Sequence, residues 1–130
     1  MSDERPAVMI LDADPESLAS HYRLLSNRGY RVATYSSAYP ACRYASEERP
    51  DAVVILTGPS LGDGLDVVRR MKEASPRSHV LLVAGSGVRP SIGEAARSGA
   101  EVLLAGTLGT EGLLSHLEEA LGERPVTSAG

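Results

Sequence analysis

Apolar runs alternate with amphipathic segments along most of this chain. Four unbroken apolar runs, typical of strands buried on both faces, occupy residues 7–11, 52–56, 80–84 and 102–105. Residues 30–35 alternate between polar and apolar side chains, as expected of a strand at a sheet edge. The run at 52–56 lies between Pro-Asp and Thr-Gly-Pro, which indicates a central strand.

Helices are predicted in the intervals between these strands. Asp14 is expected to cap the first helix, with Pro15 in its first turn and Gly29 ending it. Four more are expected over 38–48, from Asp63 to about residue 75, over 87–99 and from Thr110 to residue 121. Strands that alternate with helices predict right-handed crossovers and a parallel sheet. We therefore expect a flavodoxin-like α/β fold, with a doubly wound five-stranded sheet in the order 2-1-3-4-5 and five helices.

The length of 130 residues fits one domain, which we place at residues 1–122, with 123–130 as a flexible tail. No apolar run approaches the roughly 20 residues of a membrane span, so a cytoplasmic protein without membrane contact is expected. The net charge of -4 and the absence of Trp and Phe argue against nucleic-acid binding by this domain. The single cysteine, Cys42, is expected in the core rather than in a disulfide or a metal cluster.

Few residues of the chain suggest chemistry. The reaction site of an α/β sheet lies at the carboxyl ends of its central strands, where Leu56 and Thr57 are expected here. Asp12 and Asp14 follow the first strand, but two carboxylates offer too few oxygens for a dedicated metal site. The three histidines are scattered over three elements. The residues therefore predict neither catalysis nor a cofactor.

Several short motifs carry a resemblance to a known family. These are LDADPE at residues 11–16, Pro50-Asp51, Asp63-Gly64-Leu65 and Gly99-Ala100. In this register the chain resembles the receiver domain of bacterial two-component response regulators over residues 7–122. The resemblance implies a flavodoxin-like fold and a role in signal transduction. It also implies where a phosphorylation site would lie.

The residues at the family's functional positions depart from its pattern. The phosphoacceptor aspartate, seven positions before the Asp of Asp-Gly, falls on Leu56. The two metal-holding acids fall on Asp12 and Ala13, the phosphoryl-binding hydroxyl on Ala84, and the lysine on Gly106. Phosphoryl transfer needs a nucleophile, a divalent ion and donors for the phosphoryl oxygens. The resemblance therefore predicts a degenerate pseudo-receiver that lacks the phosphoacceptor.

The expected function is that of a non-catalytic, phosphorylation-independent protein-interaction module in bacterial signalling. The resemblance implies a protein partner, or a second copy in a homodimer, on a face that would include Ile92, Leu103 and Leu108. Two alternatives stay open. The emptied site could bind a small ligand, or Thr57 or Asp14 could accept a phosphoryl group.

Overall fold

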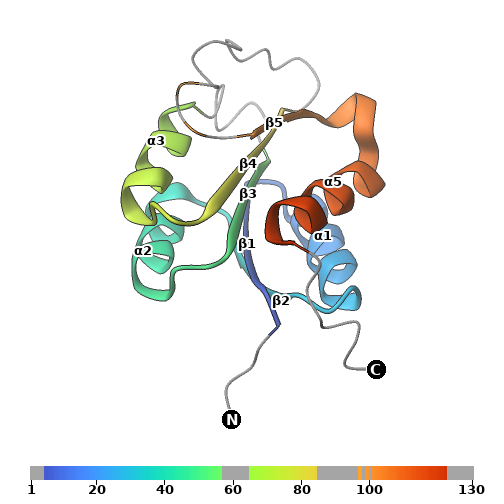
Figure 1. Ribbon diagram of the computed structural model, residues 1–130, viewed down its shortest axis with the longest axis horizontal. Helices are drawn as coiled ribbons and strands as arrows, with labels where there is room; N and C mark the ends of the chain where they lie inside the picture. The colour runs from blue at the N-terminus through green and yellow to red at the C-terminus, as the bar shows by residue number, and fades with distance from the viewer. Residues whose placement is uncertain (1–4, 57–64, 85–96, 98, 100, 123–130) are drawn as a thin grey trace.

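The computed structural model describes residues 5–56, 65–84, 97, 99 and 101–122, without the side chains of 84 and 102–111. Its parallel strands form one sheet in the order β2-β1-β3-β4-β5 (Figure 1). The strands are β1 (Ala7–Asp12), β2 (Arg31–Tyr35), β3 (Ala52–Leu56), β4 (His79–Ala84) and β5 (Glu101–Leu104). The described helices are α1 (Pro15–Asn27), α2 (Ala38–Glu48), α3 (Leu65–Ala74) and α5 (Ala105–Leu121). The flavodoxin-like α/β class with a parallel sheet is confirmed.

Helices cover both faces of the sheet, because successive strand residues point to opposite sides. One apolar core lies under α2 and α3, where Met9, Leu11, Val53 and Ile55 of β1 and β3 meet helix residues such as Met71. The other core lies under α1 and α5 and contains the intervening strand residues. Figure 1 shows α2 and α3 on one side of the sheet and α1 and α5 on the other. Burial on both faces explains the unbroken apolar runs of the central strands.

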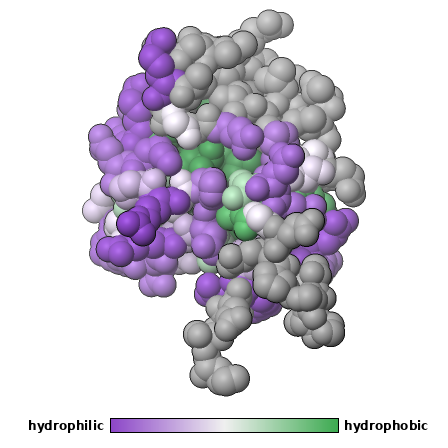
Figure 2. Space-filling model, in the orientation of Figure 1, coloured by the Kyte–Doolittle hydropathy of each residue, from purple (hydrophilic) through white to green (hydrophobic). Residues whose placement is uncertain are grey.

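The interior is almost entirely apolar, and the described surface is largely polar. Met9, Ile10, Val53 and Ile55 are fully buried in the two central strands. Figure 2 shows hydrophilic residues over most of the described part of one face, around a small apolar area near its centre. In the part of the chain that the structure describes, no helix is both long and apolar enough to cross a bilayer.

One sequence-based expectation needs correction, and another lies outside the described residues. The last helix begins at Ala105, directly after β5, and not at Thr110. A glycine inside a helix costs only about 1 kcal/mol, so the glycines before Thr110 do not prevent the helix from starting earlier. The helix expected over 87–99 falls almost wholly outside the described residues.

Candidate functional site

Asp12, Leu56 and Ala84 lie together at the carboxyl edge of the sheet. The family resemblance in the sequence assigned these residues to the positions of a phosphorylation site. Asp12 is the last residue of β1 and is the register partner of Leu56, the last residue of β3. Leu56 in turn pairs with Val83 of β4, next to Ala84. Ala84 ends β4 and pairs with Leu104. The parallel register therefore brings the ends of four neighbouring strands to one edge.

Asp12 is the buried carboxylate of this edge. Its side chain is only 6% exposed. The Oδ1 atom accepts a hydrogen bond from the backbone N–H of Asp14, at 3.0 Å. The Oδ2 atom is buried and has no hydrogen-bond partner among the described residues. Leaving a buried polar atom unpaired costs roughly 1–3 kcal/mol, and the described residues supply no hydrogen bond that would offset this cost for Oδ2.

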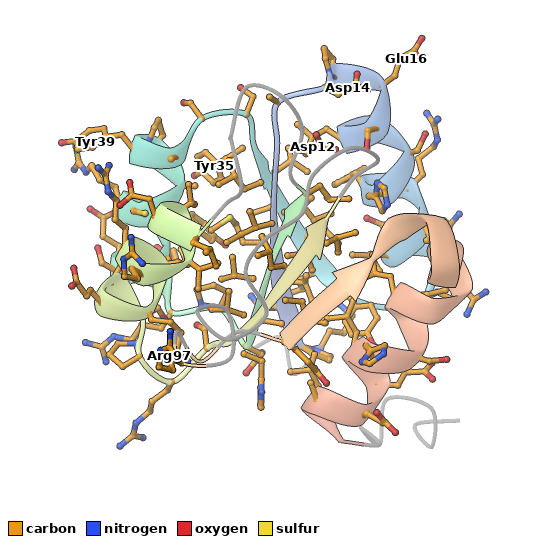
Figure 3. The ribbon with its side chains drawn as sticks, turned by 90° about the horizontal axis from the view of Figure 1, so that it is seen from above. Asp12, Asp14, Glu16, Tyr35, Tyr39 and Arg97 are labelled. Carbon is orange, nitrogen blue, oxygen red and sulfur yellow. The ribbon has the colours of Figure 1, made fainter. Side chains whose placement is uncertain are left out.

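Asp14 has a structural role that its place in the sequence predicted. Its carboxylate Oδ1 accepts the backbone N–H of Glu16 at 3.1 Å, and Pro15 is the first residue of α1. Asp14 is therefore confirmed as the N-cap of α1. Its side chain and that of Glu16 are exposed (Figure 3). Ala13, between Asp12 and Asp14, is exposed as well.

The described residues at this edge do not fit a magnesium ion. One buried carboxylate, Asp12, lies beside the apolar side chain of Leu56, which is half-buried and packs against the core under α1 and α5. Asp14 is engaged in the helix cap, and Ala13 offers no oxygen from its side chain. Within the described ranges, no three His, Cys, Asp or Glu side chains are grouped to hold a metal. Magnesium requires a near-octahedral set of oxygens, and a single carboxylate supplies too few of these ligands.

Other residues of the expected site are only partly described. Gly106 is the second residue of α5, so its backbone belongs to a helix. The structure does not describe the side chains of Ala84, Leu103 and Leu108. Thr57 and Ile92 lie outside the described residues altogether. The emptied site and the interaction face proposed around these residues are therefore untested by the structure.

Aromatic side chains flank the same edge on the β2 side. The rings of Tyr35, at the end of β2, and Tyr44 of α2 lie with their centroids 5.3 Å apart and tilted by 46°. Burial raises the pKa of Tyr44, with Glu48 and Tyr35 adding to the effect and Arg31 opposing it. Tyr39, at the start of α2, is 72% exposed (Figure 3). The aromatic cluster is thus partly packed and partly open to solvent.

Cys42 is half-buried against the core under α2 and α3. Burial raises the pKa of its thiol, and the nearby Arg70 opposes this only in part. The thiolate, not the thiol, is the reactive form of cysteine. The environment of Cys42 therefore agrees with a packing role and not with redox chemistry.

The Pro-Asp before β3 has a structural explanation that the sequence alone did not supply. The carboxylate Oδ2 of Asp51 accepts the backbone N–H of Ala7 at 2.8 Å. The backbone N–H of Asp51 donates to the carbonyl of Ala7, and its carbonyl accepts the N–H of His79. Asp51, directly before β3, thus joins the first residues of β1 and β4. The sequence marked this residue only as a motif, because its partners lie far away along the chain.

Comparison with known proteins identifies the family. Residues 8–118 match the response regulator receiver domain family. This chain therefore belongs to that family, whose members are signalling modules that act through partner proteins. Its fold resembles a response regulator receiver domain protein from Clostridium thermocellum, with a TM-score of 0.78, 24% identity and coverage of 89% of this chain and 94% of that one.

Two further proteins are similar to this chain. The receiver domain of sensor histidine kinase PA1611 from Pseudomonas aeruginosa, solved with magnesium in its active-site cleft, has a TM-score of 0.76 at 19% identity and covers 92% of this chain and 99% of that one. The transcriptional regulatory protein PrrA of Mycobacterium tuberculosis is 39% identical over 67 residues, which are 52% of this chain and 29% of PrrA. The matched region is thus under a third of the length of PrrA.

Proposed function

We propose that this receiver domain works as a protein-interaction module without being phosphorylated. The observation that carries the proposal is Leu56 at the carboxyl end of β3, in register with Asp12. A phosphoacceptor at this point would need a carboxylate, and Leu56 offers only methyl and methylene groups. Signalling would then depend on the surface of the domain and on how much of that surface its partners can reach.

The neighbouring residues support the same proposal. Phosphoryl transfer is catalysed mainly by charges placed around the phosphoryl oxygens and by a divalent ion. Ala13 replaces one acid, Ala84 replaces a hydroxyl, and Gly106 replaces a lysine. Restoring any one of these groups would leave the others missing. The acid, the hydroxyl and the lysine are all absent together, as expected of a site that no longer carries out phosphoryl transfer.

The proposed partner is a protein, or a second copy of this chain. The face around Ile92, Leu103 and Leu108 is the candidate surface, on the strength of the family resemblance. Binding of such a partner would depend on the concentration of the domain and not on whether the domain is phosphorylated. Cross-linking followed by mass spectrometry would locate the contact: links confined to α1 and α2 would count against this face.

The experiment that tests the proposed function is incubation of the native protein with acetyl phosphate and Mg²⁺, followed by intact-protein mass spectrometry. We expect no adduct of about 80 Da, the mass of one phosphoryl group. An ordinary receiver domain treated in parallel is the positive control.

An adduct on the native protein would contradict the proposal, and variants would then identify the acceptor. Loss of the adduct in Asp14→Ser, which keeps an N-cap oxygen, would implicate Asp14. Loss in Thr57→Val, which has nearly the same shape, would implicate Thr57.

Magnesium should not stabilise the fold. A ligand stabilises a protein by RT ln(1 + [L]/Kd), so an ion with no suitable site gives no measurable change. We expect the same thermal midpoint in about 10 mM MgCl₂ as in NaCl of equal ionic strength. The NaCl solution is the control because it screens surface charges to the same extent. A magnesium-specific rise of several degrees that disappears in Asp12→Asn would show that the Asp12 carboxylate does bind the ion.

A further inference from the structure

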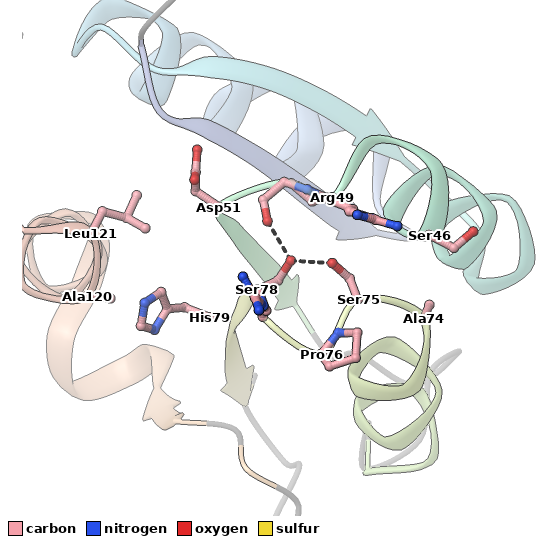
Figure 4. Close-up of a pocket in the computed structure, with 12 residues that line it drawn as sticks. Ser46, Arg49, Asp51, Ala74, Ser75, Pro76, Ser78, His79, Ala120 and Leu121 are labelled. Carbon is pink, nitrogen blue, oxygen red and sulfur yellow. Dashed lines mark hydrogen bonds between the residues drawn. The ribbon is translucent and has the colours of Figure 1, made fainter.

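A groove lies at the opposite end of the sheet from Asp12 and Leu56. It has a volume of about 610 Å³ and is formed where β3 and β4 begin, between the end of α2, the α3–β4 turn and the end of α5 (Figure 4). Binding pockets for small molecules are typically about 300–1,000 Å³. The groove is therefore large enough for a ligand, and it is separate from the site discussed above.

The lining of the groove combines cationic and apolar groups. Arg49, Arg77 and His79 can carry positive charge, and Asp51 is the one carboxylate among the lining residues. Asp51 already accepts the backbone N–H of Ala7, and Figure 4 shows its carboxylate directed away from Ser75 and Ser78. The apolar part comes from Pro50, Ala74, Pro76, Ala120 and Leu121.

The two arginines are available to a ligand. Among the described residues, no ion pair or side-chain hydrogen bond engages the guanidinium of Arg49 or Arg77. By contrast, Arg43 of α2 pairs with Glu47, and Arg70 of α3 pairs with Asp66. Glu47 and Asp66 thus pair with arginines that do not line the groove.

The wall of the groove is held rigidly in place. Ser75 and Ser78 are each only 2% exposed, and their hydroxyl oxygens are 2.6 Å apart. The hydroxyl of Ser78 donates to the carbonyl of Pro50, so Ser75 donates to Ser78. From the side of α3, Lys72 Nζ donates to the carbonyls of Pro76 and Ser78 at 3.3 and 3.1 Å. A wall fixed in advance lowers the entropy cost of binding.

Arg49 occupies a backbone conformation that its side chain disfavours. It follows α2 with φ 50° and ψ 65°, in the left-handed region, and is the one non-glycine with positive φ among the described residues. Glycine is the usual residue at such a helix end because it lacks the Cβ atom that clashes there. Strained backbone positions are common at functional sites, so the presence of an arginine here suggests that its side chain has a function.

We propose that this groove binds a small phosphate monoester with an apolar substituent. A phosphate monoester carries a charge of about -1.5 to -2 at pH 7, which the two guanidinium groups of Arg49 and Arg77 would balance. Guanidinium groups suit phosphate because they donate paired hydrogen bonds. The apolar substituent would lie against Leu121 and the prolines. The lining residues include no Tyr, Phe or Trp, so stacking of a nucleotide base is not part of the proposal.

The test is calorimetric titration of the full chain with phenyl phosphate, inorganic phosphate and benzyl alcohol at constant ionic strength. We expect phenyl phosphate to bind most tightly, inorganic phosphate more weakly and benzyl alcohol not at all. Amide NMR shifts should change mainly at residues 49–51 and 75–79. No heat with phenyl phosphate, or shifts confined to the other end of the sheet, would overturn the proposal.

Variants separate binding from stability. Arg49→Gly should raise or leave unchanged the thermal midpoint, since glycine accepts the left-handed backbone, and yet weaken phenyl phosphate binding at least about tenfold. Arg77→Ala should weaken binding to a similar degree. Arg23→Ala, which removes an exposed arginine of α1 outside the groove, is the matched control and should bind as the native protein does. Native affinity in Arg49→Gly or Arg77→Ala would overturn the proposal.

Discussion

Leu56→Asp is expected to leave the domain unphosphorylated by acetyl phosphate and to destabilise it. The new carboxylate would lie in register with the buried Asp12, whose Oδ2 already lacks a partner among the described residues. Two carboxylates on neighbouring strands repel each other, and nothing described at this edge supplies a compensating cation. A nucleophile would be gained without the charges that phosphoryl transfer requires.

The loss of stability has two parts that one control can separate. Removing a buried leucine costs about 2–5 kcal/mol, and Leu56 is only half-buried, so the lower end of this range applies. Leu56→Asn has the shape of the aspartate variant without its charge. Urea unfolding gives the free energy of unfolding of both variants, and the difference between the two values measures the charge repulsion. Leu56→Asp is expected to be the less stable variant. Equal stabilities would show that Asp12 does not sense the new charge.

Mass spectrometry of the same variants tests the chemistry. The combined variant Leu56→Asp, Ala13→Asp, Ala84→Thr and Gly106→Lys restores every missing group and should gain an adduct of about 80 Da. The single variant should not. An adduct on Leu56→Asp alone would mean that the edge supports phosphoryl transfer better than its residues suggest.

Leu117→Ala is expected to have the largest effect of any single truncation among the described side chains of α5. Leu117 is fully buried in the core under α1 and α5, together with Leu113 and Leu114. Truncation of a buried leucine leaves a cavity and costs about 2–5 kcal/mol, a large share of the stability of a domain this size. Chemical denaturation measures the change.

The control for this prediction lies two residues away on the same helix. Ser115 is exposed, so Ser115→Ala should change the free energy of unfolding by no more than about 0.5 kcal/mol. Proteolysis should cut Leu117→Ala faster near α5 than the control, because a helix that packs poorly opens more often. Equal stability of Leu117→Ala and Ser115→Ala would show that α5 contributes little to the core.

The sequence by itself determined the parallel α/β architecture and which residues end its central strands. Strands buried on both faces appear as unbroken apolar runs, and β3 was predicted with the bounds that the structure gives it. The Asp14 cap was also predictable, because a helix cap depends on residues within one turn of each other. Counting from local motifs placed Leu56 at the carboxyl end of β3 and Asp12 at the end of β1, and the register of the strands made them neighbours.

The tertiary structure alone decided the features that depend on distant parts of the chain. The burial of Asp12, the anchoring of Ala7 by Asp51, and the groove between α2, the α3–β4 turn and α5 all depend on segments far apart in the sequence. The early start of α5 was not predicted because the segment before Thr110 contains glycines, which disfavour a helix. Each glycine costs only about 1 kcal/mol, and the packing of a whole helix outweighs that cost. Sequence patterns report such local preferences, whereas burial and hydrogen-bond partners are fixed only when the chain folds.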